Sequence, residues 1–88
     1  MGQTVDIHKL VGREITYRDS FSGNQSAFLI TRIKYDENRH GYEIRGDNLG
    51  DFIFLSETRA KTLAIRSILT LRSKIYRRSY EETYTIQG

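Results

Sequence analysis

Polar and apolar side chains alternate along short segments of this chain, and glycines stand between the segments. The alternation is clear in residues 14–18 and 42–45, and Gly12, Gly23 and Gly41 lie where it breaks. A period of two residues places successive side chains on opposite faces of a β-strand. Glycine favours the chain reversals between strands. The pattern therefore predicts a mainly β protein.

The longest predicted strand runs from Gln25 to Tyr35 and is apolar on both faces at one end. Ala27 and Leu29 share one phase of the alternation, whereas Phe28 and Ile30 share the other. Such a strand either bends or passes between two layers, as in a small closed barrel. Residues 52–55 are uniformly apolar and predict a short buried strand.

A helix is predicted from Ser56 to Ala64. Ala60, Leu63 and Ala64 have helical spacing, and Ser56 is a favourable residue to cap the first turn. After this helix, the tyrosines Tyr76 and Tyr80 are four residues apart, which suits one face of either a helix or a strand.

For the C-terminal stretch we predict a hairpin of two strands, Ile68–Tyr76 and Tyr80–Ile86, because β-branched and aromatic residues are frequent there. A continuous helix from Arg72 to Tyr84 is the alternative.

These elements predict a single domain over residues 1–88: a small SH3-like or Sm-like β-barrel of five to six short antiparallel strands with one short helix at about 56–64. Leu, Ile, Val and Phe account for 23 of the 88 residues, above the ~20% below which chains are usually disordered. Because a core of this size is small, association of copies through strand edges is a further expectation.

Residues 12–63 resemble the layout of a WYL domain, an Sm-like barrel module. The matching segments are 13–19, 41–44, 52–55 and 56–59, and Tyr42 is the only residue of the Trp-Tyr-Leu signature present. The resemblance implies an Sm-like barrel that senses a ligand or nucleic acid and is not an enzyme.

Positive charge is concentrated near the C-terminus. The net charge is +3, but residues 1–57 hold seven cations against nine acids, whereas residues 58–88 hold seven cations against two. A segment of one sign attracts phosphates or acidic surfaces, and tyrosines among the cations offer rings for base stacking. The predicted nucleic-acid or anion-binding residues are Arg59, Lys61, Arg66, Arg72, Lys74, Tyr76, Arg77, Arg78 and Tyr80.

Structural explanations of the same residues stay open. The basic segment 58–80 is also compatible with an ordinary solvated surface, and the tyrosines with barrel closure beneath outward-pointing arginines. Phe21, in a polar turn, either anchors an interface or folds back onto the barrel.

Motifs for catalysis are missing from the sequence. There is no cysteine, and the two histidines, His8 and His40, are far apart in sequence. The adjacent acids at 36–37 and 81–82 offer no pair of contrasting environments for acid–base work, and no phosphate-binding glycine motif occurs. We therefore expect no enzyme activity, no cofactor and no metal.

The longest unbroken apolar runs have four residues, Ala27–Ile30 and Phe52–Leu55, against ~18 for a membrane span. We expect a cytoplasmic protein without a membrane segment.

The leading functional hypothesis is a small nucleic-acid-binding β-barrel that uses the basic C-terminal segment. One alternative is a phage-type interaction module that inhibits a host protein by binding an acidic surface. Another is a sensor or sequestering protein for a nucleotide-like anionic ligand.

Overall fold

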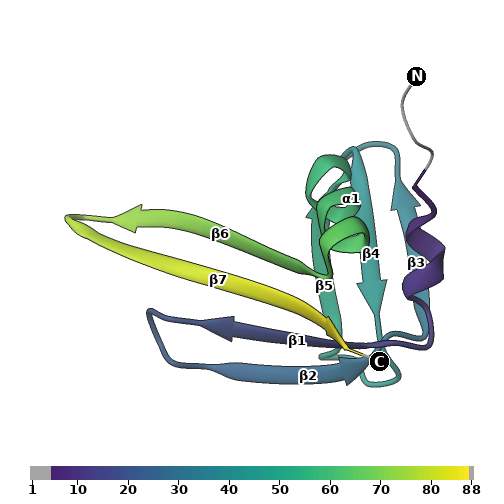
Figure 1. The fold of residues 1–88 in the computed structure, drawn as a ribbon, viewed down its shortest axis with the longest axis horizontal. Coiled ribbons are helices and arrows are strands. Elements are labelled where there is room, and N and C mark those ends of the chain that lie inside the picture. Colours follow the sequence, from purple (N-terminus) through teal and green to yellow (C-terminus); the bar gives the residue numbers. More distant parts are fainter. Residues whose placement is uncertain (1–4, 88) are drawn as a thin grey trace.

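The computed structural model describes residues 5–87, which form seven strands, one α-helix and a short 3₁₀ helix (Figure 1). Residues 1–4 and 88 of the predicted domain lie outside the described part. In chain order the elements are η1 (Ile7–Leu10), β1 (Glu14–Asp19), β2 (Gln25–Leu29), β3 (Arg32–Asp36), β4 (Gly41–Arg45), β5 (Phe52–Ser56), α1 (Glu57–Arg66), β6 (Ile68–Ile75) and β7 (Arg78–Gln87).

The strands form two antiparallel sheets, with orders β2-β1-β7-β6 and β3-β4-β5. In the first sheet, β1 lies between β2 and β7, so that Glu14 is opposite both Leu29 and Gln87. The prediction of a mainly β fold is confirmed. The count of five to six strands is wrong, because the longest predicted strand is two strands.

The division of that strand occurs where the chain passes from one sheet to the other. The N–H of Ile30 donates to the carbonyl of Arg13 at 2.9 Å, and the next N–H, of Thr31, donates to the carbonyl of Arg45 at 2.9 Å. Two successive amides are thus bonded to different sheets, and Ile30 is completely buried between them. The predicted passage between two layers is confirmed, whereas the described residues show no closed barrel.

The core lies between the three-stranded sheet, the base of the four-stranded sheet and the two helices. Helix α1 contributes Ala60, Leu63 and Ala64, and η1 contributes Ile7 and Leu10. The strands and the β2–β3 connection supply the remaining buried apolar side chains, namely Ile15, Ile30, Ile33, Ile44, Leu55, Leu69, Tyr84 and Ile86.

Helix α1 begins after the predicted cap, where the Oγ of Ser56 accepts from the N–H of Arg59 at 3.4 Å. It extends two residues beyond the predicted end and stops at Ser67, which has a left-handed φ of 62°. The short η1 was not predicted, because four residues are too few to show a helical period.

The predicted C-terminal hairpin is confirmed, and the alternative helix over 72–84 is wrong. Strands β6 and β7 pair from Ile68 opposite Thr85 to Ile75 opposite Arg78. This hairpin extends well beyond the body formed by α1 and the three-stranded sheet, as Figure 1 shows. We call the hairpin, residues 68–87, the arm. Strand β6 is an edge of its sheet, and association through strand edges stays a prediction.

Within residues 5–87, no helix has both the length and the apolar character needed to cross a membrane.

Candidate functional site

The side chains of the arm become more exposed from its base to its far end, because only the base packs against the core. On β6, Leu69 is buried and Leu71 half-buried, but Ser73 and Ile75, which continue the same face, are exposed. On β7 the same gradient runs from buried Tyr84 to half-buried Tyr80 and exposed Arg78. The outer part of the arm is therefore a two-stranded ribbon without a core, and side chains there are free to serve another purpose.

A turn of two residues, Tyr76 and Arg77, joins the strands at the far end of the arm. The Tyr76 side chain is 99% exposed, and its backbone has a left-handed φ of 57°. Turns that need a positive φ usually carry Gly, Asn or Asp, because the left-handed region is unfavourable for a residue with a Cβ. A large aromatic residue at this position therefore costs stability and buries nothing in return.

Phe21 reaches the arm from the turn between β1 and β2. Its ring centroid lies 5.7 Å from that of Tyr80, with the ring planes at 57°, and Phe21 is still 58% exposed. The turn is held against β7 by two hydrogen bonds. The N–H of Ser20 donates to the Glu81 carbonyl at 2.9 Å, and the N–H of Glu81 donates to the Ser20 Oγ at 2.8 Å.

Asp19 fixes the shape of that turn. Its carboxylate accepts from the N–H of Phe21 at 2.8 Å and from the hydroxyl of Ser22 at 3.1 Å, and Gly23 has a positive φ of 74°. Phe21 is thus held by its backbone beside the arm. The Phe21 ring is exposed and also contacts Tyr80, and its role as an interface anchor stays a prediction.

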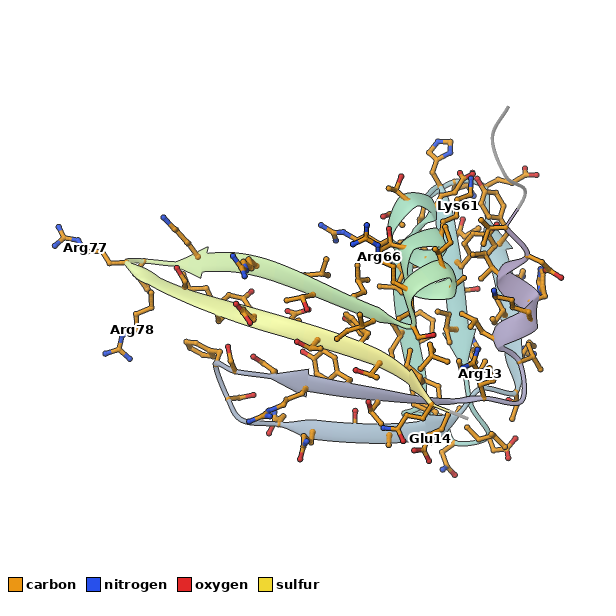
Figure 2. The ribbon with its side chains drawn as sticks, viewed as in Figure 1. Arg13, Glu14, Lys61, Arg66, Arg77 and Arg78 are labelled. Atoms are coloured by element: carbon orange, nitrogen blue, oxygen red, sulfur yellow. The ribbon has the colours of Figure 1, made fainter. Side chains whose placement is uncertain are left out.

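An open, mostly apolar depression lies between these two turns, lined by Phe21, Ile75, Tyr76, Arg77 and Arg78. We call these five residues the tip. Figure 2 shows Arg77 and Arg78 at the far end of the arm, away from the body. The described residues place no carboxylate within 4.0 Å of either guanidinium.

The predicted basic residues do not form one continuous surface. Arg59, Lys61 and Arg66 lie on α1, whereas Lys74, Arg77 and Arg78 lie at or beside the tip. Strand β6 separates the two groups, and its eight residues span about 25 Å at ~3.3 Å per residue. Figure 2 shows Arg66 beside the body and Arg77 at the other end of the arm.

Ion pairs reduce the charge of two of the predicted residues. The Nε of Arg72 lies 3.2 Å from an oxygen of Glu81, and the Nζ of Lys61 lies 3.2 Å from an oxygen of Glu57. Lys74 shares the face of Arg72, opposite the face of Ile75 and Tyr80. The uncompensated cations nearest the tip are therefore Lys74, Arg77 and Arg78 among the described residues.

The predicted tyrosines have different environments. Tyr76 is fully exposed, so closure of a barrel by its ring is wrong, while half-buried Tyr80 packs on Phe21. The sequence analysis missed Ile75 as part of this surface. The sequence does indicate it, because Ile75 has the same phase as Leu69 and Leu71, with polar Ser73 interrupting the apolar alternation between them.

Tyr17 and Tyr84 form a second aromatic pair at the base of the arm, with centroids 5.1 Å apart. Burial, together with the nearby Glu82 carboxylate, raises the pKa of Tyr84 to about 12 and raises that of Tyr17 as well. Both hydroxyls therefore stay protonated at neutral pH. The Tyr84 hydroxyl donates to a carboxylate oxygen of Glu82 at 3.5 Å.

A cleft of about 350 Å³ lies next to this pair, between the two sheets. Its aromatic walls are formed by Tyr17, Phe28, Phe52, Phe54 and Tyr84, and Asp51 supplies a carboxylate. None of the described residues that line it is a lysine or arginine. The cleft therefore does not favour the anionic small ligand considered above.

Comparisons with protein-family models, with curated proteins and with solved structures return no match.

Proposed function

We propose that this chain is a non-enzymatic nucleic-acid-binding protein and that the outer end of the arm is its binding surface. The observation that supports this most directly is that Lys74, Arg77 and Arg78 lie at the end of the arm within two residues of fully exposed Tyr76. Cations that project from a narrow ribbon can approach the phosphates of a nucleic acid without a clash from the body. Phosphate contacts of this kind supply most of the affinity in binding that is not sequence-specific.

We also propose that the two sheets are arranged as in an Sm-like barrel. The support for this arrangement is the short connection from β2 to β3 through Ile30 and Thr31, whose amides donate to the carbonyls of Arg13 and Arg45. In small barrels a connection of this kind forms the corner. The arm would then be an extension of such a module, with the body acting as its support.

A titration of labelled DNA and RNA oligonucleotides at several salt concentrations tests the proposal. The logarithm of the binding constant falls with the logarithm of salt concentration with a slope of about −0.9 per phosphate neutralised in duplex DNA, and about −0.7 in single strands. Replacing Arg77 and Arg78 together by Ala should weaken binding and flatten the slope by up to about 2.

The matched control removes the same charge from the helix, as Arg59→Ala with Arg66→Ala. These two residues lie on the exposed side of α1, and the variant should retain the slope of the unmodified protein. The proposal is wrong if no DNA or RNA shows salt-sensitive binding. The outer end of the arm is not the binding surface if the Arg59 and Arg66 variant weakens binding as much as the Arg77 and Arg78 variant does.

A protein-interaction module is the second candidate, and the free edge of β6 favours it. Edge strands offer unpaired N–H and C=O groups to an incoming strand, and tyrosine and arginine are frequent in the energetic centres of interfaces. A pull-down that recovers one stoichiometric protein partner and is insensitive to nuclease would support this candidate over nucleic-acid binding.

A further inference from the structure

The tip combines three exposed, largely apolar side chains that lie outside the hydrophobic core. Ile75 is 40% exposed, Phe21 58% and Tyr76 99%. The side chains lie beyond the part of the arm that the core supports. They leave a depression between the two turns that is open to solvent. Exposed apolar surface with a polar rim usually marks a binding site.

Two other aromatic rings, exposed Phe52 and half-buried Phe54, already have a cationic partner. The Arg39 guanidinium lies 3.7 Å from the centroid of the Phe54 ring, and that of Arg45 lies 4.6 Å from the centroid of Phe52. Among the described residues, no cation covers Tyr76, and its hydroxyl has no hydrogen-bond partner. Tyr76 therefore presents a ring whose faces are available to a ligand.

The backbone places this ring in the depression at a cost. A φ of 57° is strained for tyrosine, and strain of this kind is concentrated at functional positions. On the opposite wall, Phe21 is fixed by the bonds of Asp19 to its own turn and by those of Ser20 to β7. The Phe21 side of the depression is thus held in place before any ligand arrives.

We propose that the tip is a stacking site for an unpaired nucleobase, formed by Phe21, Ile75 and Tyr76, with Arg77 and Arg78 binding the flanking phosphates. This inference rests on the proposed function and names its ligand class, a single strand or an unpaired region within a duplex. A base inside a continuous duplex has both faces covered by its neighbours and offers none to Tyr76. Stacking is tolerant of sequence because every base has a flat aromatic face.

The test uses three labelled probes of matched sequence: a single strand, a fully paired duplex, and a duplex with one unpaired base. At equal salt concentration the protein should bind the single strand and the bulged duplex about tenfold or more tightly than the paired duplex. Tyr76→Asn removes the ring and keeps a residue that tolerates a positive φ. It should weaken single-strand binding by about 5- to 150-fold.

The salt dependence separates stacking from phosphate binding. Tyr76→Asn and Phe21→Leu should lower affinity without changing the slope, since neither substitution removes a charge. The control Phe52→Leu alters an aromatic residue on the other sheet, whose ring already lies beside Arg45, and should bind as the unmodified protein does. Thermal unfolding of each variant shows whether the fold is kept.

Each outcome decides between the two proposals. Salt-sensitive binding that Tyr76→Asn leaves intact overturns the stacking site and leaves the proposed function standing. Equal affinity for paired and unpaired probes also overturns the stacking site. If no probe binds at any salt concentration, both proposals fail.

Discussion

Arg72 and Glu81 face each other across the two strands of the arm, with the Nε of Arg72 3.2 Å from the carboxylate of Glu81. Both side chains are at least half exposed, so the pair contributes little to stability. Its effect is on charge, because it neutralises a cation on the face that also carries Lys74. Glu81 therefore limits how positive the outer arm is.

Glu81→Gln should strengthen nucleic-acid binding, because it frees the charge of Arg72. We expect the slope of binding against salt concentration to steepen by up to about 0.9 if Arg72 then contacts a phosphate. Anisotropy titrations at several salt concentrations measure this. Glu57→Gln frees Lys61 on α1 in the same way and should leave the slope unchanged. Identical effects of the two variants would contradict a binding surface confined to the arm.

Tyr76→Gly should stabilise the fold while it weakens binding. Glycine adopts a φ of 57° without the penalty that tyrosine has there, although it also adds freedom to the unfolded chain. The net gain in the free energy of unfolding should be about 1 kcal/mol, measured by urea denaturation. Arg77→Gly is the control, because Arg77 has no positive φ, and it should not stabilise. Loss of stability in Tyr76→Gly would show that the turn is unstrained.

Gly41→Ala should destabilise the three-stranded sheet severely. A Cβ at Gly41 would lie 2.5 Å from the carbonyl oxygen of Leu55 and 2.5 Å from the ring of Phe54. Both atoms belong to β5, and because β4 lies between β3 and β5 it cannot move away from β5 without moving into β3. We therefore expect a loss of at least about 2 kcal/mol. Gly50→Ala has open space around it and should change the free energy of unfolding by less than about 0.5 kcal/mol. Equal stability of the two variants would contradict the packing at Gly41.

Alkaline pH should weaken the fold through Tyr84. Burial raises the pKa of Tyr84 to about 12, whereas the unfolded chain has a tyrosine pKa of about 10. Between these values the folded state binds more protons than the unfolded state, so the free energy of unfolding falls as pH rises. The contribution of Tyr84 to the free energy of unfolding is complete below pH ~10 and is lost by pH ~12. It amounts to up to about 2 kcal/mol.

Urea denaturation at pH 9 and pH 11.5, compared between the unmodified protein and Tyr84→Phe, isolates this effect. The phenylalanine variant lacks the titrating hydroxyl and should lose less stability over the same interval. Parallel losses in both proteins would show that Tyr84 is not the group responsible.

The sequence predicted most elements because their signals are local. The period of two residues located the strands, and Ser56 with Ala60 and Leu63 located α1. The hairpin of β6 and β7 was also predicted, although the spacing of Tyr76 and Tyr80 alone fits a helix equally well. The passage between sheets was visible as apolar residues on both faces, but its division into two strands depends on which carbonyls Ile30 and Thr31 meet.

The candidate site was predicted only in part, because neighbours in sequence are not neighbours in space. Arg66 and Arg77 belong to one basic segment, yet strand β6 separates Arg66 at the body from Arg77 at the far end of the arm. Conversely, Phe21 is remote in sequence from Tyr80 and contacts it through the fold. The ion pair of Arg72 with Glu81 depends on which residues face each other in the hairpin. Composition alone does not reveal that register.

The pairing of β1 with β7 has a consequence for how the protein is made. Glu14 is opposite Gln87, so the four-stranded sheet cannot assemble until its last strand has left the ribosome. At about 5–20 residues per second, the β1–β2 hairpin waits several seconds with one edge unpaired. Contacts this distant in sequence also slow folding. The nascent chain is therefore expected to be most vulnerable to aggregation just before synthesis of β7 is complete.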